Sequence, residues 1–211
     1  DDNAKRYMEI CRRDLNVLGV QPATYYPRTS EHVDDILEIS KGLMEKGFAY
    51  EKLRSIYFDI SKFSDYGRLS RVDLQKIRLG KTVDLEAYEK LNPRDFTLLR
   101  RATLAELKRG IYLKTSWGNV LPSLHLETVA LAMKQLGETI DIHVSSLDFL
   151  FPHNENEIAI ARAATGKPLA NYYIHCERVL MDGKKMSREG EDRVTVQQLL
   201  EDGYSGRQIR Y

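Results

Sequence analysis

The chain has 211 residues, which is enough for one or two domains with a substantial buried core. Its 32 lysines and arginines balance 31 aspartates and glutamates, so the net charge of +1 gives no overall sign of a nucleic-acid-binding protein. Cys11 and Cys176 are too few for a disulfide framework or a thiolate-only zinc site, and they favour a reducing compartment, by default the cytoplasm.

Two further features of the sequence concern targeting and length. No apolar run approaches the roughly 20 residues of a membrane span, and the N-terminus lacks the basic-then-apolar pattern of a signal peptide. The chain starts at Asp1 rather than methionine and runs straight into a helical pattern. We therefore expect it to begin inside a longer protein.

Two amphipathic helices are predicted in the first part of the chain. Residues 4–18 place apolar side chains at helical spacing, and Gly19 is a typical stop. Ser30 is predicted to cap a second helix that ends at Gly47. From residue 48 the apolar period changes to two, which predicts a β-hairpin, and the polar stretch that follows to about residue 110 completes an inserted module.

The second part of the chain alternates between helices and strands. Pro122 and Ser123 open a predicted helix that stops at Gly137. A strand (139–144), a helix (153–165) and a strand (172–181) are predicted next. This alternation is typical of a parallel sheet, so the predicted fold class is α/β.

Polar side chains are concentrated where the strand at 139–144 passes into the following helix. In open α/β sheets, ligands bind at the carboxyl ends of strands. His153 and Glu157 are four residues apart, which brings their β-carbons to about 5–6 Å on one helix face and suits two ligands of one metal ion. The alternative is that the acidic residues only complement the positive end of the helix dipole.

Three other candidate groups each have a structural alternative. Asp148 follows a strand, where a carboxylate can accept both ribose hydroxyls, although Asp is also common in turns. The segment D-G-K-K-M-S-R at 182–188 could close on a triphosphate, or could be a solvated hairpin tip. Cys176 beside His175 is interpreted as core packing rather than as a nucleophile.

Taken together, several motifs resemble the cysteinyl-tRNA synthetases, which are class I aminoacyl-tRNA synthetases. The resemblance covers essentially the whole chain, and the order and spacing of the motifs are kept. The motifs are T-S-E-H-V (29–33), Y-F-D-I-S-K-F-S-D-Y-G-R-L-S (57–70), N-P-R-D-F (92–96), L-G-E-T-I-D-I-H (136–143), F-P-H-N-E-N-E-I-A (151–159), A-A-T-G-K-P (163–168) and K-M-S-R (185–188).

The resemblance implies part of a Rossmann-type catalytic domain that is split by a connective insertion. Residues 1–47 would lead from the first half of the core, 48–115 would form the insertion, 116–181 the second half of the core, and 182–211 the signature loop and the start of a helical region. The family's first ATP motif and first zinc-binding cysteine precede these segments. The chain alone is therefore expected to be catalytically incomplete.

The family reaction activates cysteine with ATP, with magnesium as the accompanying ion, and transfers it to tRNA. By resemblance, the catalytic residues would lie in the signature loop, the ATP-binding residues there and beside the strand, and the zinc ligands at the start of the helix. These residues are Lys185, Ser187 and Arg188 for catalysis, Asp148, His143, Lys185 and Met186 for ATP, and His153 and Glu157 for zinc.

Departures from the family pattern fall mainly on the zinc half of the site. Thr128 stands where the family has a zinc-binding cysteine, and a hydroxyl is a poor substitute for a thiolate. Val144 to Leu147 replace a glycine-rich turn before Asp148, which makes close approach to a nucleotide less easy. Arg188 is followed by Glu189 where the family has Lys and Ser. We therefore expect weak or absent zinc and an altered amino-acid substrate.

Two alternatives remain open at this stage. One is a ligase derived from a synthetase that joins the amino acid to a small molecule instead of tRNA. The other is a catalytically silent paralogue that binds a protein or RNA. The presence of an anticodon-binding region would favour tRNA as the acceptor, and the absence of an upstream ATP motif would favour the silent paralogue.

Overall fold

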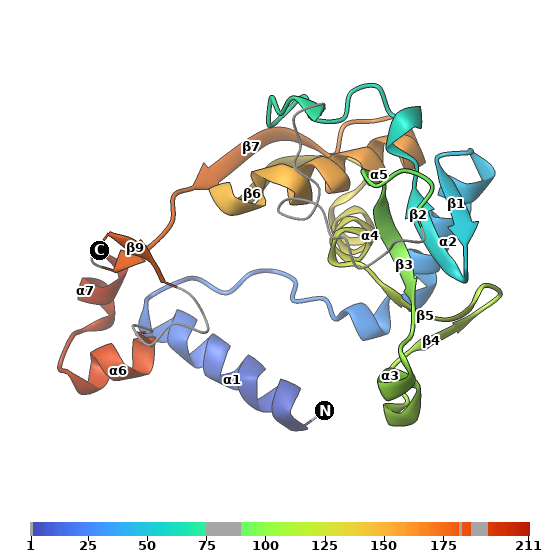
Figure 1. The fold of residues 1–211 in the computed structure, drawn as a ribbon. Coiled ribbons are helices and arrows are strands. Elements are labelled where there is room, and N and C mark those ends of the chain that lie inside the picture. The colour runs from blue at the N-terminus through green and yellow to red at the C-terminus, as the bar shows by residue number, and fades with distance from the viewer. Residues whose placement is uncertain (1, 75–89, 182, 187–193) are drawn as a thin grey trace. The chain divides into compact units, whose positions relative to one another are not determined.

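A computed structural model describes residues 2–74, 90–181, 183–186 and 194–211 (Figure 1). The chain divides into two compact units, one formed by Asp1–Tyr26 with Arg178–Tyr211 and the other by Pro27–Glu177. Asp182, Ser187 and Arg188 of the predicted signature loop lie outside the described residues. The domain boundaries drawn from the resemblance stay predictions.

The larger unit contains a five-stranded antiparallel sheet in the order β1-β2-β3-β5-β4. The predicted hairpin is confirmed as β1 and β2, whose tight turn places Leu53 and Arg54 at positive φ. The other strands come from the polar stretch of the predicted inserted module and from the residues after it. The strands are β1 (Ala49–Lys52), β2 (Ser55–Phe58), β3 (Phe96–Arg101), β4 (Leu113–Thr115) and β5 (Gly118–Pro122).

Between β3 and β4 lies a short helix, α3 (Leu104–Arg109), that the apolar pattern did not predict. Thr103 accepts a hydrogen bond from the backbone N–H of Glu106, and the Glu106 side chain accepts one from the backbone N–H of Thr103, which together form a capping box. Gly110 ends the helix at φ 70°. The T-x-x-E spacing followed by glycine was the signal that could have identified it.

Two longer helices pack against the sheet and against each other in the larger unit. The second predicted helix is α2 (Val33–Glu45), but it begins after a short 3-10 turn at Thr29–Glu31, so the predicted capping role of Ser30 is wrong. His32 occupies the N-cap position and contacts Asp35 at 3.0 Å instead of capping a backbone group. The next helix, α4 (Leu124–Leu136), begins as predicted, with Ser123 accepting from the N–H of Leu126.

The core of this unit is built from aromatic and aliphatic side chains of β2, β3, β5 and the helices. The ring of Phe58 stacks on that of Phe96, with centroids 4.8 Å apart, and meets Phe63 edge-on. The largest fully buried apolar side chains are Tyr57, Phe58, Ile36, Leu43, Ile56, Leu98, Leu99, Leu126, Ile160, Leu169 and Val120. This packing fixes the sheet against the starts of α4 and α5, where the candidate site lies.

The predicted parallel unit is confirmed as β6 (Ile140–Ser146), α5 (Glu155–Thr165) and β7 (Ala170–Cys176). The largest differences from the predicted boundaries are at the start of the helix and the end of the second strand. The helix starts at Glu155, because Leu150–Asn154 form a kinked turn with extended backbone at Phe151. The strand β7 ends at Cys176, and Leu180–Met181 pair with Lys184–Lys185 as a separate hairpin, β8 and β9.

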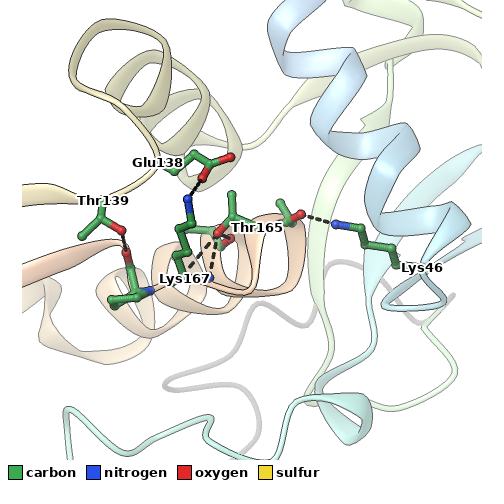
Figure 2. Close-up of polar contacts among 8 residues, drawn as sticks. Lys46, Glu138, Thr139, Thr165 and Lys167 are labelled. Atoms are coloured by element: carbon green, nitrogen blue, oxygen red, sulfur yellow. Dashed lines mark hydrogen bonds and ion pairs between the residues drawn. The ribbon is translucent and has the colours of Figure 1, made fainter.

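The loop between α5 and β7 is held by a set of polar contacts (Figure 2). Gly166 ends α5 at φ 78°, as its position predicts. The Lys46 ammonium donates to the carbonyl of Ala164 in the last turn, where the helix dipole favours a cation. Lys167 pairs with Glu138 at 2.5 Å, which ties this loop to the segment that leads into β6.

The smaller unit contains α1 (Asp2–Val17), the β8–β9 hairpin, α6 (Val196–Glu201) and α7 (Gly206–Arg210). The predicted helix at 4–18 is confirmed as α1. Arg210 donates to the carbonyl of Gly19 at 3.1 Å, so α7 packs beside the end of α1. Within the described residues, no helix is long and apolar enough to cross a membrane.

Two glycines give opposite predictions for substitution by alanine. A β-carbon on Gly206 would lie 1.9 Å from the carbonyl oxygen of Val17, so Gly206→Ala should separate α7 from α1 and lower the melting temperature of the smaller unit. Gly42 lies inside α2 with open space around it, so Gly42→Ala should raise the unfolding free energy of the larger unit by about 0.5–1 kcal/mol. Calorimetric scans of both variants check this pair. Unchanged melting in Gly206→Ala would contradict the close packing.

Candidate functional site

A cavity of about 560 Å³ lies in the larger unit, bounded by the antiparallel sheet, the start of α4 and the turn that precedes α5. This volume falls within the range of about 300–1,000 Å³ that is common for small-molecule sites. Its wall has more apolar than polar surface, but several polar and charged residues also line it. The lining includes Tyr66, Phe96, Phe151, His125 and His153 together with Lys90, Arg94, Asp95 and Arg100.

Two of the lining side chains form a histidine pair. Nε2 of His125 lies 2.8 Å from Nδ1 of His153. His125 comes from the first turn of α4 and meets Phe96 edge-on, whereas His153 belongs to the kinked turn and lies against Phe149. Burial, and then repulsion from His153, lowers the pKa of His125 to about 4, and burial also lowers the pKa of His153. Both rings are therefore neutral near pH 7.

A second polar network lies between α5 and the strands β6 and β7. The Asn154 carbonyl oxygen accepts from the Ser145 hydroxyl at 2.8 Å and from Nε2 of His175 at 3.0 Å, and its amide donates to Oε2 of Glu157 at 3.0 Å. The same Glu157 oxygen lies 3.1 Å from Nε2 of His143. Ser145, His143 and His175 therefore point towards α5, because alternate residues of a strand face the same side.

The positions that the resemblance assigned to zinc do not fit that ion in this arrangement. His153 uses Nδ1 in the contact with His125, and Glu157 Oε2 is shared by His143 and Asn154. Thr128 supplies no thiolate. No group of three histidine, cysteine, aspartate or glutamate side chains could hold a metal ion among the residues that the structure describes. The donor set favours a hydrogen-bonded site instead.

The motif E-N-E at 155–157 has a structural role that the sequence did not reveal. Both Glu155 carboxylate oxygens accept from backbone N–H groups, those of Gly67 at 3.0 Å and Ser70 at 2.7 Å. The Tyr66 hydroxyl donates to Asn156. Burial, reinforced by the Glu155 charge, raises the pKa of Tyr66, so this hydroxyl stays a donor. The turn that carries Tyr66 into the cavity wall is thus attached to α5.

Asp95 organises another part of the cavity wall. Its carboxylate is buried and accepts from the Tyr50 hydroxyl at 2.8 Å, the Ile60 N–H at 3.1 Å and the Asn92 N–H at 3.3 Å. Burial raises its pKa, and these hydrogen bonds oppose that rise. In the sequence, Asp95 is notable only as part of the motif N-P-R-D-F, without a role of its own. The contacts show that it fixes the turn on which Arg94 reaches the cavity.

The residues predicted to bind ATP are distributed over both units. Asp148 lies in the turn Leu147–Phe149 directly after β6, and its N–H donates to the Ser146 hydroxyl at 3.3 Å. His143 is largely buried against Glu157. Lys185 and Met186 belong to the smaller unit, at β9 and directly after it. Their roles at a nucleotide stay predictions.

The fold thus combines a parallel β-α-β unit, with polar groups after its first strand, and an antiparallel module that shares a cavity with it. The whole chain, residues 1–211, matches the family described as tRNA synthetases class I (C) catalytic domain. The chain belongs to this family, which confirms the resemblance found in the sequence.

Individual relatives agree with the family match. The chain is 40% identical over 210 residues to a cysteine–tRNA ligase of Methanosarcina mazei, covering 100% of this chain and 44% of the relative. It is 42% identical over 207 residues to the cysteine–tRNA ligase of Pyrococcus abyssi, a match that covers 98% of this chain and 42% of the relative. It is 37% identical over 206 residues to the cysteine–tRNA ligase of Chlamydia pneumoniae, a match that covers 97% of this chain and 43% of the relative. The chain therefore spans less than half the length of these relatives.

Proposed function

We propose that this chain is part of an ATP-dependent ligase that activates an amino acid and transfers it to tRNA. The observation that carries the proposal is the family match over residues 1–211, supported by relatives named cysteine–tRNA ligase. The cavity beside the β6–α5 junction supports it independently, since ligands of α/β sheets bind at the carboxyl ends of strands.

The proposed residue roles fall into two groups, those that bind ATP and those that bind the amino acid. Asp148 would hold the ribose, and Lys185, Met186, Ser187 and Arg188 would close on the phosphates that magnesium accompanies. A cation brought to the leaving pyrophosphate stabilises charge that develops only in the transition state, which raises the rate. The cavity with His125 and His153 would receive the amino acid.

We further propose that amino-acid selection differs from that of a zinc-dependent cysteine enzyme. Thr128 and the hydrogen-bonded state of His153 and Glu157 support this, because a zinc site that lacks its thiolate loses its preference for sulfur. A cytoplasmic location is part of the proposal and is supported by the low cysteine content.

The test is amino-acid-dependent exchange of labelled pyrophosphate into ATP. It should use the longest natural polypeptide that contains this chain, with each of the standard amino acids in turn. We expect exchange with at least one amino acid and its loss in a Lys185→Ala variant. Exchange with none of them would contradict the ligase. Cysteine as the clear best substrate, with one bound zinc per chain, would contradict the altered selectivity alone.

A further inference from the structure

We infer that His125 is a positioning residue that fixes His153 as a hydrogen-bond donor towards the cavity. The site would then recognise an uncharged acceptor group on its ligand instead of a metal-bound thiolate. The assignment of that ligand as an amino acid rests on the proposed function. The donor state of His153 follows from contacts within the described part of the chain.

The first step concerns which ring carries the shared proton. A neutral imidazole has one N–H and one lone pair, so one histidine of the pair donates and the other accepts. His125 Nδ1 is buried and has no hydrogen-bond partner among the described residues. If His153 donated, the proton of His125 would sit on Nδ1 as a buried N–H without an acceptor. Buried N–H groups without an acceptor are rarer than buried acceptors without a donor. His125 Nε2 therefore donates to His153 Nδ1.

The second step follows for His153. Its Nδ1 lone pair is occupied by the hydrogen bond from His125, so its own proton sits on Nε2. His153 is among the residues that line the cavity, and no described residue accepts a hydrogen bond from its Nε2. The ring thus keeps a free Nε2–H and no lone pair for a metal ion. His125 acts through His153, in the way that outer partners set the tautomer of a functional imidazole.

His143 shows the same arrangement with a partner that leaves no choice. Its Nε2 lies 3.1 Å from Glu157, and a carboxylate only accepts, so Nε2 carries a proton. Its Nδ1 is likewise buried without a partner among the described residues. A buried imidazole Nδ1 without a partner therefore occurs twice in this cluster. The same contact occupies Glu157 and supports the conclusion that zinc does not fit here.

The third step is the class of ligand. An N–H on a ring that packs against Phe149 and belongs to the cavity lining favours a short side chain that ends in a neutral acceptor, a hydroxyl oxygen or an un-ionised thiol. Such a donor separates cysteine from serine by no more than about a hundredfold, because an N–H donates to a hydroxyl oxygen and to a thiol sulfur alike. It should discriminate more strongly against alanine, which lacks the acceptor.

The tautomer can be measured directly by long-range 15N NMR of the histidine-labelled 211-residue chain, without any activity assay. We expect His153 Nε2 to show the shift of a protonated nitrogen and Nδ1 that of an unprotonated one. His125→Gln should preserve this state, because the glutamine amide can still donate. His125→Leu should give a mixture of tautomers. A control variant, His32→Gln, alters a histidine that does not line the cavity and should leave His153 unchanged.

Ligand reading is tested by titrating the same chain with L-serine, L-cysteine and L-alanine. Serine and cysteine should shift the His153 Nε2–H signal at comparable concentrations, and alanine should not. Either of two results would overturn the inference even if the ligase activity is real. One is an unprotonated His153 Nε2 in the unmodified chain. The other is stoichiometric binding of zinc by that chain, with no further increase in His125→Leu. Pyrophosphate exchange with no amino acid, together with the expected tautomer, would instead reject only the proposed function.

Discussion

Replacing Glu155 with alanine is expected to lower the free energy of unfolding of the larger unit by about 3 kcal/mol. The carboxylate is 1% exposed and is the acceptor for the backbone N–H groups of Gly67 and Ser70. Each buried donor left without an acceptor costs about 1–3 kcal/mol. Urea unfolding followed by fluorescence checks this, because the single tryptophan, Trp117, packs against the core of the same unit.

Glu138 provides the matched control for this experiment. It pairs with Lys167 on the surface, where both side chains are more than half exposed, so Glu138→Ala should change stability by no more than about 1 kcal/mol. Equal effects of the two substitutions would show that the contacts of Glu155 with the turn at 67–70 contribute no more to the free energy of unfolding than an exposed ion pair does. A larger effect of Glu155→Ala would also imply that Tyr66 loses its fixed place in the cavity wall.

Substituting Asn154 by leucine is expected to cost about 3 kcal/mol and to loosen β6 and β7 from α5. Leucine has a similar volume but removes the acceptor of Ser145 and His175 and one donor to Glu157. Amide hydrogen exchange, read along both strands, measures the local effect together with global unfolding. The amides of Ser145 and His175 should exchange faster in the variant.

Asn119 is the control for the second prediction. It lies half-buried on β5, and its side chain makes no hydrogen bond with a described residue, so Asn119→Leu should change stability by less than about 1 kcal/mol. Unchanged exchange in β6 and β7 of Asn154→Leu would indicate that the two strands are held by their own pairing and apolar contacts. In that case Asn154 would serve the site and not the fold.

The helices and the parallel unit could be predicted because their signals are local. α1 and α2 follow from apolar side chains at helical spacing, and β6, α5 and β7 follow from alternating periods separated by glycine and proline. The five-stranded sheet could not be predicted in the same way. Its central pairing joins β3 to β5, which are separated in the chain by α3 and β4. The sequence of neither strand identifies the strand with which it pairs.

The site shows the same division between local and non-local information. Of the histidines and acids that the sequence pattern singled out around the end of β6, His153 lines the cavity. The roles of individual members depended on contacts over long separations, such as His125 with His153 and Glu155 with Gly67. Consecutive residues of a helix point in directions about 100° apart, so Glu155, Asn156 and Glu157 each meet a different neighbour.

By itself, the sequence determined the family and the helical and strand periods, since these are written in residue identity and spacing. Only the tertiary structure decided that Glu157 pairs with His143 and that His125 lies within hydrogen-bonding distance of His153. The physical reason is that a hydrogen bond depends on the distance and direction between atoms, which the fold sets and residue spacing along the chain does not.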